Sequence, residues 1–116
     1  MLEYTIHANE NDAVYLSKQV RDFLMDEKSA EFVSLAMKEL LMYILEINNK
    51  LDWIDVIVRD NDKSTIISIK NSGIGYNPQT DTELNSKHID NLISISDNID
   101  YSQILGLNNT VITINK

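Results

Sequence analysis

The sequence lacks cysteine and has one proline, three glycines and one tryptophan among its 116 residues. Without cysteine, disulfide bonds and thiolate metal sites are excluded. The sequence also has no apolar run of membrane-spanning length, and no signal peptide with a basic start and a small-residue cleavage site. We therefore expect one cytoplasmic domain over residues 1–116, long enough to bury one core.

Basic residues are scarce as well, since 10 lysines and arginines face 18 acidic residues and give a formal net charge of −8. Nucleic-acid backbones and anionic membrane surfaces attract basic faces, so the composition argues against both as partners. The charge is explained by solubility alone, or it favours a basic protein partner. It leaves a magnesium–nucleotide complex open, because local groups decide that kind of binding.

Apolar spacing predicts eight elements in the order strand, helix, helix, strand, strand, helix, strand, strand. We place the second helix after Ser29 as its N-cap and expect a turn at 106–109 before the last strand. This order favours an α+β fold, a two-layer sandwich with a mostly antiparallel sheet of about five strands and three helices on one face. The expected ranges are 2–7, 12–26, 29–48, 53–59, 64–71, 86–97, 99–105 and 110–114.

Two of the three glycines and the proline lie in the segment 66–78, where a strand passes into the loop Asn71-Ser72-Gly73-Ile74-Gly75. Glycine allows a close approach of the backbone to a ligand and a positive φ. A strand followed by this pattern is typical of nucleotide pockets. It is neither the dinucleotide fingerprint nor a P-loop, because no third glycine and no Gly-Lys-Ser/Thr follow.

On the second predicted helix, Glu39, Tyr43 and Glu46 follow each other at i, i+4 and i+7 and so form one stripe beside the apolar face. A carboxylate there can act as a general base in a pocket between the helix and the following loop. The alternative is an ordinary solvated helix edge. His7 and His88 have no second His or Cys spaced to share a metal, so we assign them structural or surface roles and name no metal ligand.

Three separated segments, in order, resemble the small ATP-binding domains of the histidine-kinase-like ATPase superfamily (the Bergerat fold), and among them the anti-sigma-factor serine kinases. The helix segment Ala36–Ile44 resembles the family helix with Glu and, four residues later, Asn. The resemblance implies that Glu39 is the general base and that Tyr43 stands at the magnesium-binding Asn position. A phenol is a poor ligand for magnesium, which prefers compact oxygen donors in octahedral array.

The second segment is the loop after Asn71, which resembles the family's Asp-x-Gly-x-Gly. The resemblance implies that Asn71 accepts from the adenine amino group, without the charge of an Asp, and that Gly73 and Gly75 let the backbone pass the base. The third segment is 86–114, where family members carry a Gly-x-Gly lid before a helix. No glycine stands there, although Ser86 and Lys87 at the helix start can still meet a phosphate. The resemblance also puts Thr110 near the phosphates or the base.

The resemblance implies ATP and Mg²⁺ as cofactors, a regulatory protein such as a sigma factor or an anti-anti-sigma-like protein as partner, and a homodimer. The first hypothesis is an ATP-binding regulatory domain that phosphorylates a serine of its partner with Glu39 as base. The alternative is a degenerate member without ATPase or kinase activity that serves as a protein-binding module. The departures at Tyr43, at Asn71 and in the lid favour the alternative.

Overall fold

The computed structural model describes residues 1–24, 27–48, 53–78 and 86–116. Their radius of gyration is 13.0 Å, as expected for a compact domain of this length. The order of elements agrees with the sequence prediction. The elements are β1 (Leu2–His7), α1 (Glu10–Phe23), α2 (Glu27–Ile47), β2 (Trp53–Asp60), β3 (Ser64–Ser72), α3 (Lys87–Ile95), β4 (Asn98–Ile104) and β5 (Leu107–Asn115).

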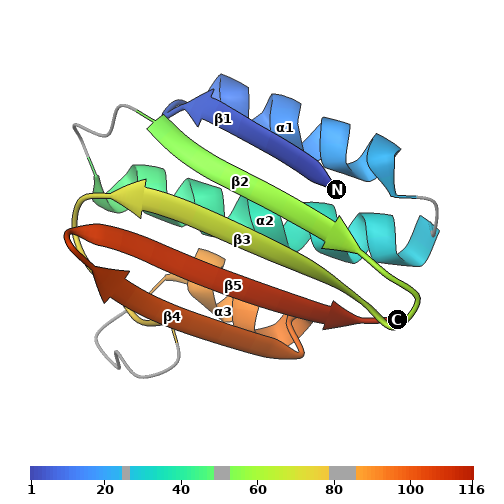
Figure 1. Ribbon diagram of the computed structural model, residues 1–116. Coiled ribbons are helices and arrows are strands. Elements are labelled where there is room, and N and C mark those ends of the chain that lie inside the picture. The colour runs from blue at the N-terminus through green and yellow to red at the C-terminus, as the bar shows by residue number, and fades with distance from the viewer. Residues whose placement is uncertain (25–26, 49–52, 79–85) are drawn as a thin grey trace.

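The five strands form one antiparallel sheet in the order β1-β2-β3-β5-β4. All three helices lie on one face of it, behind the sheet in Figure 1. The expected two-layer α+β arrangement, with five strands and three helices on one face, is therefore confirmed. The other face of the sheet carries no helix from the described part of the chain.

Alternation along the strands decides which side chains form the core. On β2, Ile54, Val56 and Val58 point toward the helices and are buried, whereas their neighbours are half-buried or exposed. The helices contribute a buried stripe at helical spacing. That stripe comprises Ala13, Leu16 and Val20 of α1, Val33, Ala36, Met37, Leu40, Leu41 and Ile44 of α2, and Ile89 and Leu92 of α3.

The two long helices begin earlier than the sequence indicates. The side chain of Asn9 accepts from the N–H of Asp12, so the cap lies at Asn9 and α1 starts at Glu10. It ends at Phe23 because Leu24 is already extended, and 25–26 lie outside the described residues. Ser29 is buried inside the first turn of α2 and is not its N-cap. Serine is tolerated there because the first-turn N–H groups have no intrahelical acceptor, so a side-chain hydroxyl does not compete with a helical hydrogen bond.

The C-terminal elements differ from the prediction in two places. Helix α3 spans Lys87–Ile95, shorter than 86–97, because Ser96 is extended and the N–H of Asp97 donates to the carbonyl of Thr113. Strand β5 starts three residues before the predicted 110, because β3 and β4 both offer it partners there. The predicted turn over 106–109 is instead a two-residue turn, Leu105-Gly106, with φ of 54° and 77°.

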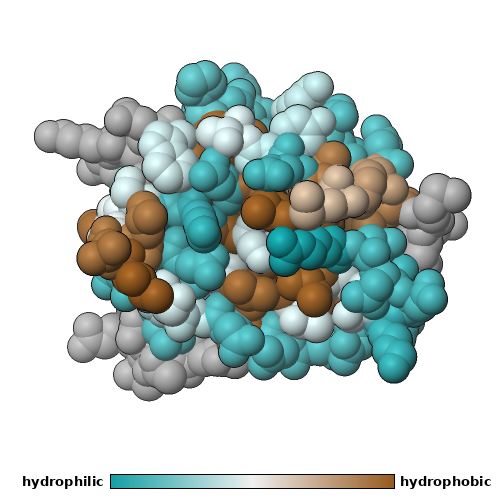
Figure 2. Space-filling view, viewed as in Figure 1, coloured by the Kyte–Doolittle hydropathy of each residue, from teal (hydrophilic) through white to brown (hydrophobic). Residues whose placement is uncertain are grey.

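Figure 2 shows the open face of the sheet, with apolar side chains gathered at its left end over the β4–β5 turn. Ile104, Leu105 and Leu107 are exposed there. Trp53 lies at the start of β2 at the same end and is 38% exposed. Its neighbour Ile54 takes the core position, so alternation turns Trp53 outward.

Candidate functional site

The helix-facing side of the sheet ends in polar residues where β3 ends and β5 begins. Asn71 of β3 lies opposite Asn108 of β5, and Thr110 follows two residues later on the same side. All three are fully buried. Buried polar side chains are costly without hydrogen bonds, so their partners decide what this end of the sheet can do.

The side chain of Tyr76 packs against Thr110 and is only 2% exposed. Its hydroxyl lies 3.0 Å from Oγ1 of Thr110. Its ring meets that of Tyr43 edge-on at 5.6 Å and 78°, and that of Tyr101 at 5.1 Å and 41°. Both arrangements are favourable for aromatic pairs. Burial raises the pKa of the Tyr76 phenol well above its usual range, so the group is neutral in the folded protein.

A chain of hydrogen bonds fixes the backbone around Tyr76. The hydroxyl of Tyr101 accepts from the N–H of Tyr76 at 2.9 Å and donates to Oδ1 of Asn108 at 2.5 Å. The amide nitrogen of Asn108 in turn donates to the carbonyl of Ile74 at 3.1 Å. The loop after β3 is thereby attached to β4 and β5, with each member of the network paired.

The two glycines of the loop stand where the chain's own side chains come close. A Cβ on Gly73, which has φ of +111°, would lie 2.2 Å from Oδ1 of Asn48 at the end of α2. That oxygen accepts from the N–H of Ile74 at 2.9 Å. A Cβ on Gly75 would lie 2.9 Å from Oε1 of Gln103. The positive φ and the Asn48 contact thus require Gly73, whether or not a ligand binds, whereas at Gly75 only the end of the exposed Gln103 side chain would have to shift.

Asn71 differs from its neighbours because half of its amide is unused. Its Nδ2 donates to the carbonyl of Ser72 at 2.9 Å, whereas its Oδ1 is buried and has no hydrogen-bond partner among the described residues. Oδ1 of Asn109 is in the same condition. An unpaired buried acceptor costs about 1–3 kcal/mol, so the Asn71 oxygen is available to a ligand that brings an N–H donor.

The stripe predicted on α2 runs from the core to solvent. Tyr43 is buried, the Glu39 side chain is 14% exposed and the Glu46 side chain is 63% exposed. His88, at the start of α3, lies against both carboxylates. Its Nδ1 is 2.6 Å from Oε2 of Glu39 and its Nε2 is 3.8 Å from Oε2 of Glu46. We had assigned His88 a structural or surface role, and the structure gives it a specific partner in Glu39.

Ser86 and Lys87, the two residues predicted to meet a phosphate, lie at the start of α3. Oγ of Ser86 accepts from the N–H of His88 at 3.2 Å, so Ser86 is the N-cap of α3. Lys87 is exposed. The resemblance places the lid around 85–88, and of these residues 85 lies outside the described residues, as does the rest of the segment 79–85. No three His, Cys, Asp or Glu side chains of the described residues are grouped closely enough to hold a metal.

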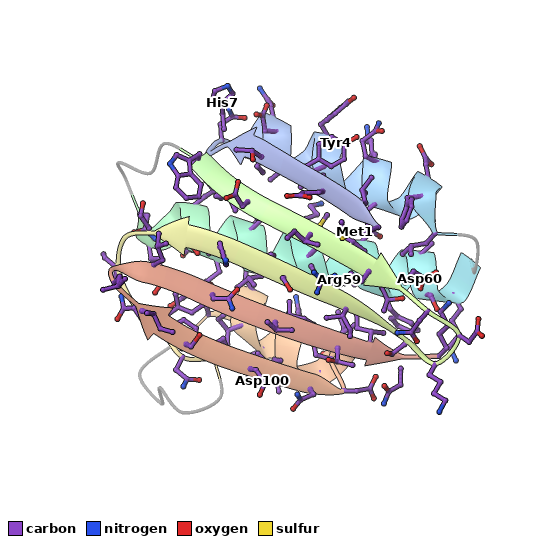
Figure 3. The ribbon with its side chains drawn as sticks, in the orientation of Figure 1. Met1, Tyr4, His7, Arg59, Asp60 and Asp100 are labelled. Atoms are coloured by element: carbon purple, nitrogen blue, oxygen red, sulfur yellow. The ribbon has the colours of Figure 1, made fainter. Side chains whose placement is uncertain are left out.

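A hollow of about 510 Å³ opens beside His88, between the start of α1 and the end of α2. Glu10, Glu46 and Asn48 line it together with His88. His7 lies near this end of the sheet but on the edge strand, and Figure 3 shows its ring projecting away from the sheet. The exposed side chain of His7 is therefore no part of the Glu39–His88 pair.

Sequence reasoning missed Tyr76, Asn108, Asn48 and His88 as parts of this region. Asn48 contacts Ile74 across 26 residues of sequence and Glu39 contacts His88 across 49, and no local spacing predicts such pairs. For Tyr76 and Asn108 a signal existed. Tyr76 follows directly on Gly75, and Asn108 is in phase with Thr110 along one strand.

Comparison with protein-family models and with curated proteins finds no match to this chain. Among the helices of the described residues, none combines the length and the apolar character needed to cross a bilayer.

Proposed function

We propose that this chain is a non-catalytic regulatory domain of the histidine-kinase-like ATPase type, which works by binding a protein partner. The order of elements and the three motif segments support the Bergerat-type arrangement. The observation that carries the proposal is the position of Tyr76. Its ring fills the space between Tyr43, Tyr101 and Thr110. The resemblance expects magnesium at Tyr43 and the phosphates or the base near Thr110, so the ring takes space expected for the nucleotide.

The residues at the expected magnesium site do not fit the metal. Tyr43 is 5% exposed and packs edge-on against Tyr76, so a neutral buried phenol stands where a compact oxygen ligand is required. The expected base, Glu39, is engaged by His88 at 2.6 Å. No phosphoryl-transfer step is therefore assigned to this chain.

The rest of the proposal follows from charge and resemblance. The formal charge of −8 favours a protein over a nucleic acid as partner. A regulatory protein, of the sigma-factor or anti-anti-sigma kind, is the partner class that the resemblance implies, and a homodimer is the expected assembly. Cytoplasmic location completes the proposal.

Isothermal titration with ATP, with and without magnesium, tests this function. We expect no binding by the wild-type chain up to about millimolar ATP, because the base would have to displace a buried aromatic side chain that contributes several kcal/mol. Micromolar binding that strengthens with magnesium would overturn the proposal. In that case Tyr43→Asn is the informative variant, since it restores the family's magnesium ligand and should change the magnesium dependence.

A second candidate function is ATP binding, with transfer to a serine of the partner, after Tyr76 has moved out. The buried, unpaired Oδ1 of Asn71 favours it, because that oxygen can accept from an adenine amino group. Asn71→Leu keeps the branching and the number of heavy atoms but removes the acceptor, together with the Nδ2 donor to Ser72. If wild type binds ATP and folded Asn71→Leu does not, the second candidate replaces the first.

A further inference from the structure

A groove of about 290 Å³ runs between α1 and α2, the two helices that lie side by side in Figure 1. Each helix lines it with residues at i, i+3, i+4 or i+7 spacing, so one face of each helix contributes. Val14 and Leu35 are the two apolar residues among the eight that line it, and Leu35 is 40% exposed. This groove is separate from the region around Tyr76 and shares no residue with it.

The charge of the groove is opposite to that of the chain. Lys18 and Arg21 of α1 and Lys38 of α2 line it, against a single carboxylate, Glu31. Within the described residues none of the three cations has a carboxylate within salt-bridge distance, since the ion pairs found there join His88 to Glu39 and Glu46, and Lys116 to Asp60. Three of the chain's 10 basic residues thus surround one apolar hollow.

Helix stability explains one of these cations. Arg21 lies in the last turn of α1, where a positive charge complements the helix dipole. Lys38 lies in the middle of α2 and Lys18 more than a turn before the end of α1, so the dipole gives them little. Unpaired cations around an exposed leucine fit an outside ligand that supplies both carboxylates and an apolar side chain.

We propose that the α1–α2 groove docks an acidic amphipathic helix of a protein partner, with an apolar side chain placed on Leu35 and carboxylates facing Lys18, Arg21 and Lys38. The inference rests on the proposed function, because it names the surface through which that function acts. Helices bind grooves of this kind with anchors at i, i+3 and i+4. A second copy meeting groove to groove brings the same cations together and is disfavoured. The net charge of −8 by itself favours a basic partner and opposes an extended anionic bilayer, which would face the whole surface. A single acidic helix is favoured only by the local charge of the groove, where three cations face one carboxylate.

The test uses the full chain, labelled with ¹⁵N, and a synthetic helical peptide that carries leucine at i, i+3 and i+7, glutamate at the positions flanking the leucines and alanine elsewhere. We expect amide shifts confined to 14–21 and 31–38. Binding should weaken by about tenfold or more when the glutamates become glutamine, and also in the charge-reversal variants Lys18→Glu and Lys38→Glu. Lys63→Glu, the same charge change at the exposed β2–β3 turn, is the matched control and should bind as wild type does.

Three results would overturn the proposed docking at the groove: no binding at about millimolar peptide, amide shifts centred elsewhere, or an equal loss of peptide affinity in Lys63→Glu. The ATP titration separates this failure from that of the proposed function. If wild type binds neither ATP nor the peptide, the groove inference fails and the regulatory-domain proposal stands on its own test. If wild type binds magnesium–ATP, the regulatory-domain proposal fails whatever the peptide does.

Discussion

The region around Tyr76 and the α1–α2 groove treat their polar groups in opposite ways. Around Tyr76 the hydroxyls of Tyr76 and Tyr101 and both ends of the Asn108 amide are paired within the chain. In the groove, Lys18 and Lys38 are exposed and have no ion pair within the described residues. The polar groups of the region with the predicted motif are thus mostly bonded within the chain, whereas the cations of the groove are free to meet a ligand.

This difference shows that residues predicted from a ligand-binding motif can instead make contacts that stabilise the fold. Gly73 leaves room for Asn48, Gly75 leaves room for Gln103, and Glu39 is held by His88. The unpaired oxygen of Asn71 is the exception. We therefore expect substitutions around Tyr76 to change folding stability strongly, and substitutions in the groove to change binding and leave stability almost unaltered.

Tyr76→Ala should produce the largest effect. Removing a fully buried aromatic side chain costs about 3–5 kcal/mol, and here it also takes the partner from Thr110. Urea denaturation followed by circular dichroism measures the loss. A loss below about 1 kcal/mol would mean that the Tyr76 side chain contributes little to stability. The region around Tyr76 would then not differ from the groove in its effect on folding.

Gly73→Ala should be next in size. A φ of +111° is strained for alanine, and its Cβ would displace the Asn48 oxygen from the N–H of Ile74. We expect a loss of about 1–3 kcal/mol. The matched control is Gly106→Ala, which has φ of +77° but open space around its Cβ, and which should lose about 1 kcal/mol. Equal losses in the two variants would show that backbone conformation alone, without the Asn48 contact, fixes Gly73.

The fold was more predictable than the site. Alternation in segments such as Ile54–Val58 and helical spacing in the stripe from Val33 to Ile44 are local signals, and they gave the right elements in the right order. Element ends were less predictable, because caps such as Asn9 and strand partners such as those of Leu107 compete with periodicity. The α+β class followed from the order of elements.

The candidate site could be predicted in part. Short segments identify Asn71, the glycines and Glu39 as candidates. The structure brings Tyr43 and Thr110 together around Tyr76, and it places Asn71 at the same end of the sheet, opposite Asn108. What occupies that space is decided by packing between distant segments. The sequence distance of 49 residues between Glu39 and His88 left their pairing beyond reach of any local pattern.

The third largest effect should be the loss of folding stability at alkaline pH, to which the buried Tyr76 phenol contributes. Burial raises the pKa of the Tyr76 phenol, so the fold favours the neutral form. This contribution is complete below a pH of about 10, the ordinary tyrosine pKa, and is lost as the pH rises further, by up to about 1.4 kcal/mol per pH unit. Denaturation at several alkaline pH values should show a steeper loss in wild type than in Tyr76→Phe. Parallel curves would contradict the buried, neutral phenol.

The smallest expected effect belongs to the groove. Lys18→Gln and Lys38→Gln remove exposed cations that have no ion pair within the described residues, so the free energy of unfolding should change by less than about 0.5 kcal/mol. The sign should be neutral or slightly stabilising, because Lys38→Gln relieves repulsion from Arg21 across the groove and Lys18→Gln relieves it at i, i+3 on α1. The same denaturation assay measures it, with Lys63→Gln as control. A loss above about 1 kcal/mol in either groove variant would mean that these lysines stabilise the fold, as Gly73 does. The groove would then resemble the region around Tyr76 in its contribution to stability.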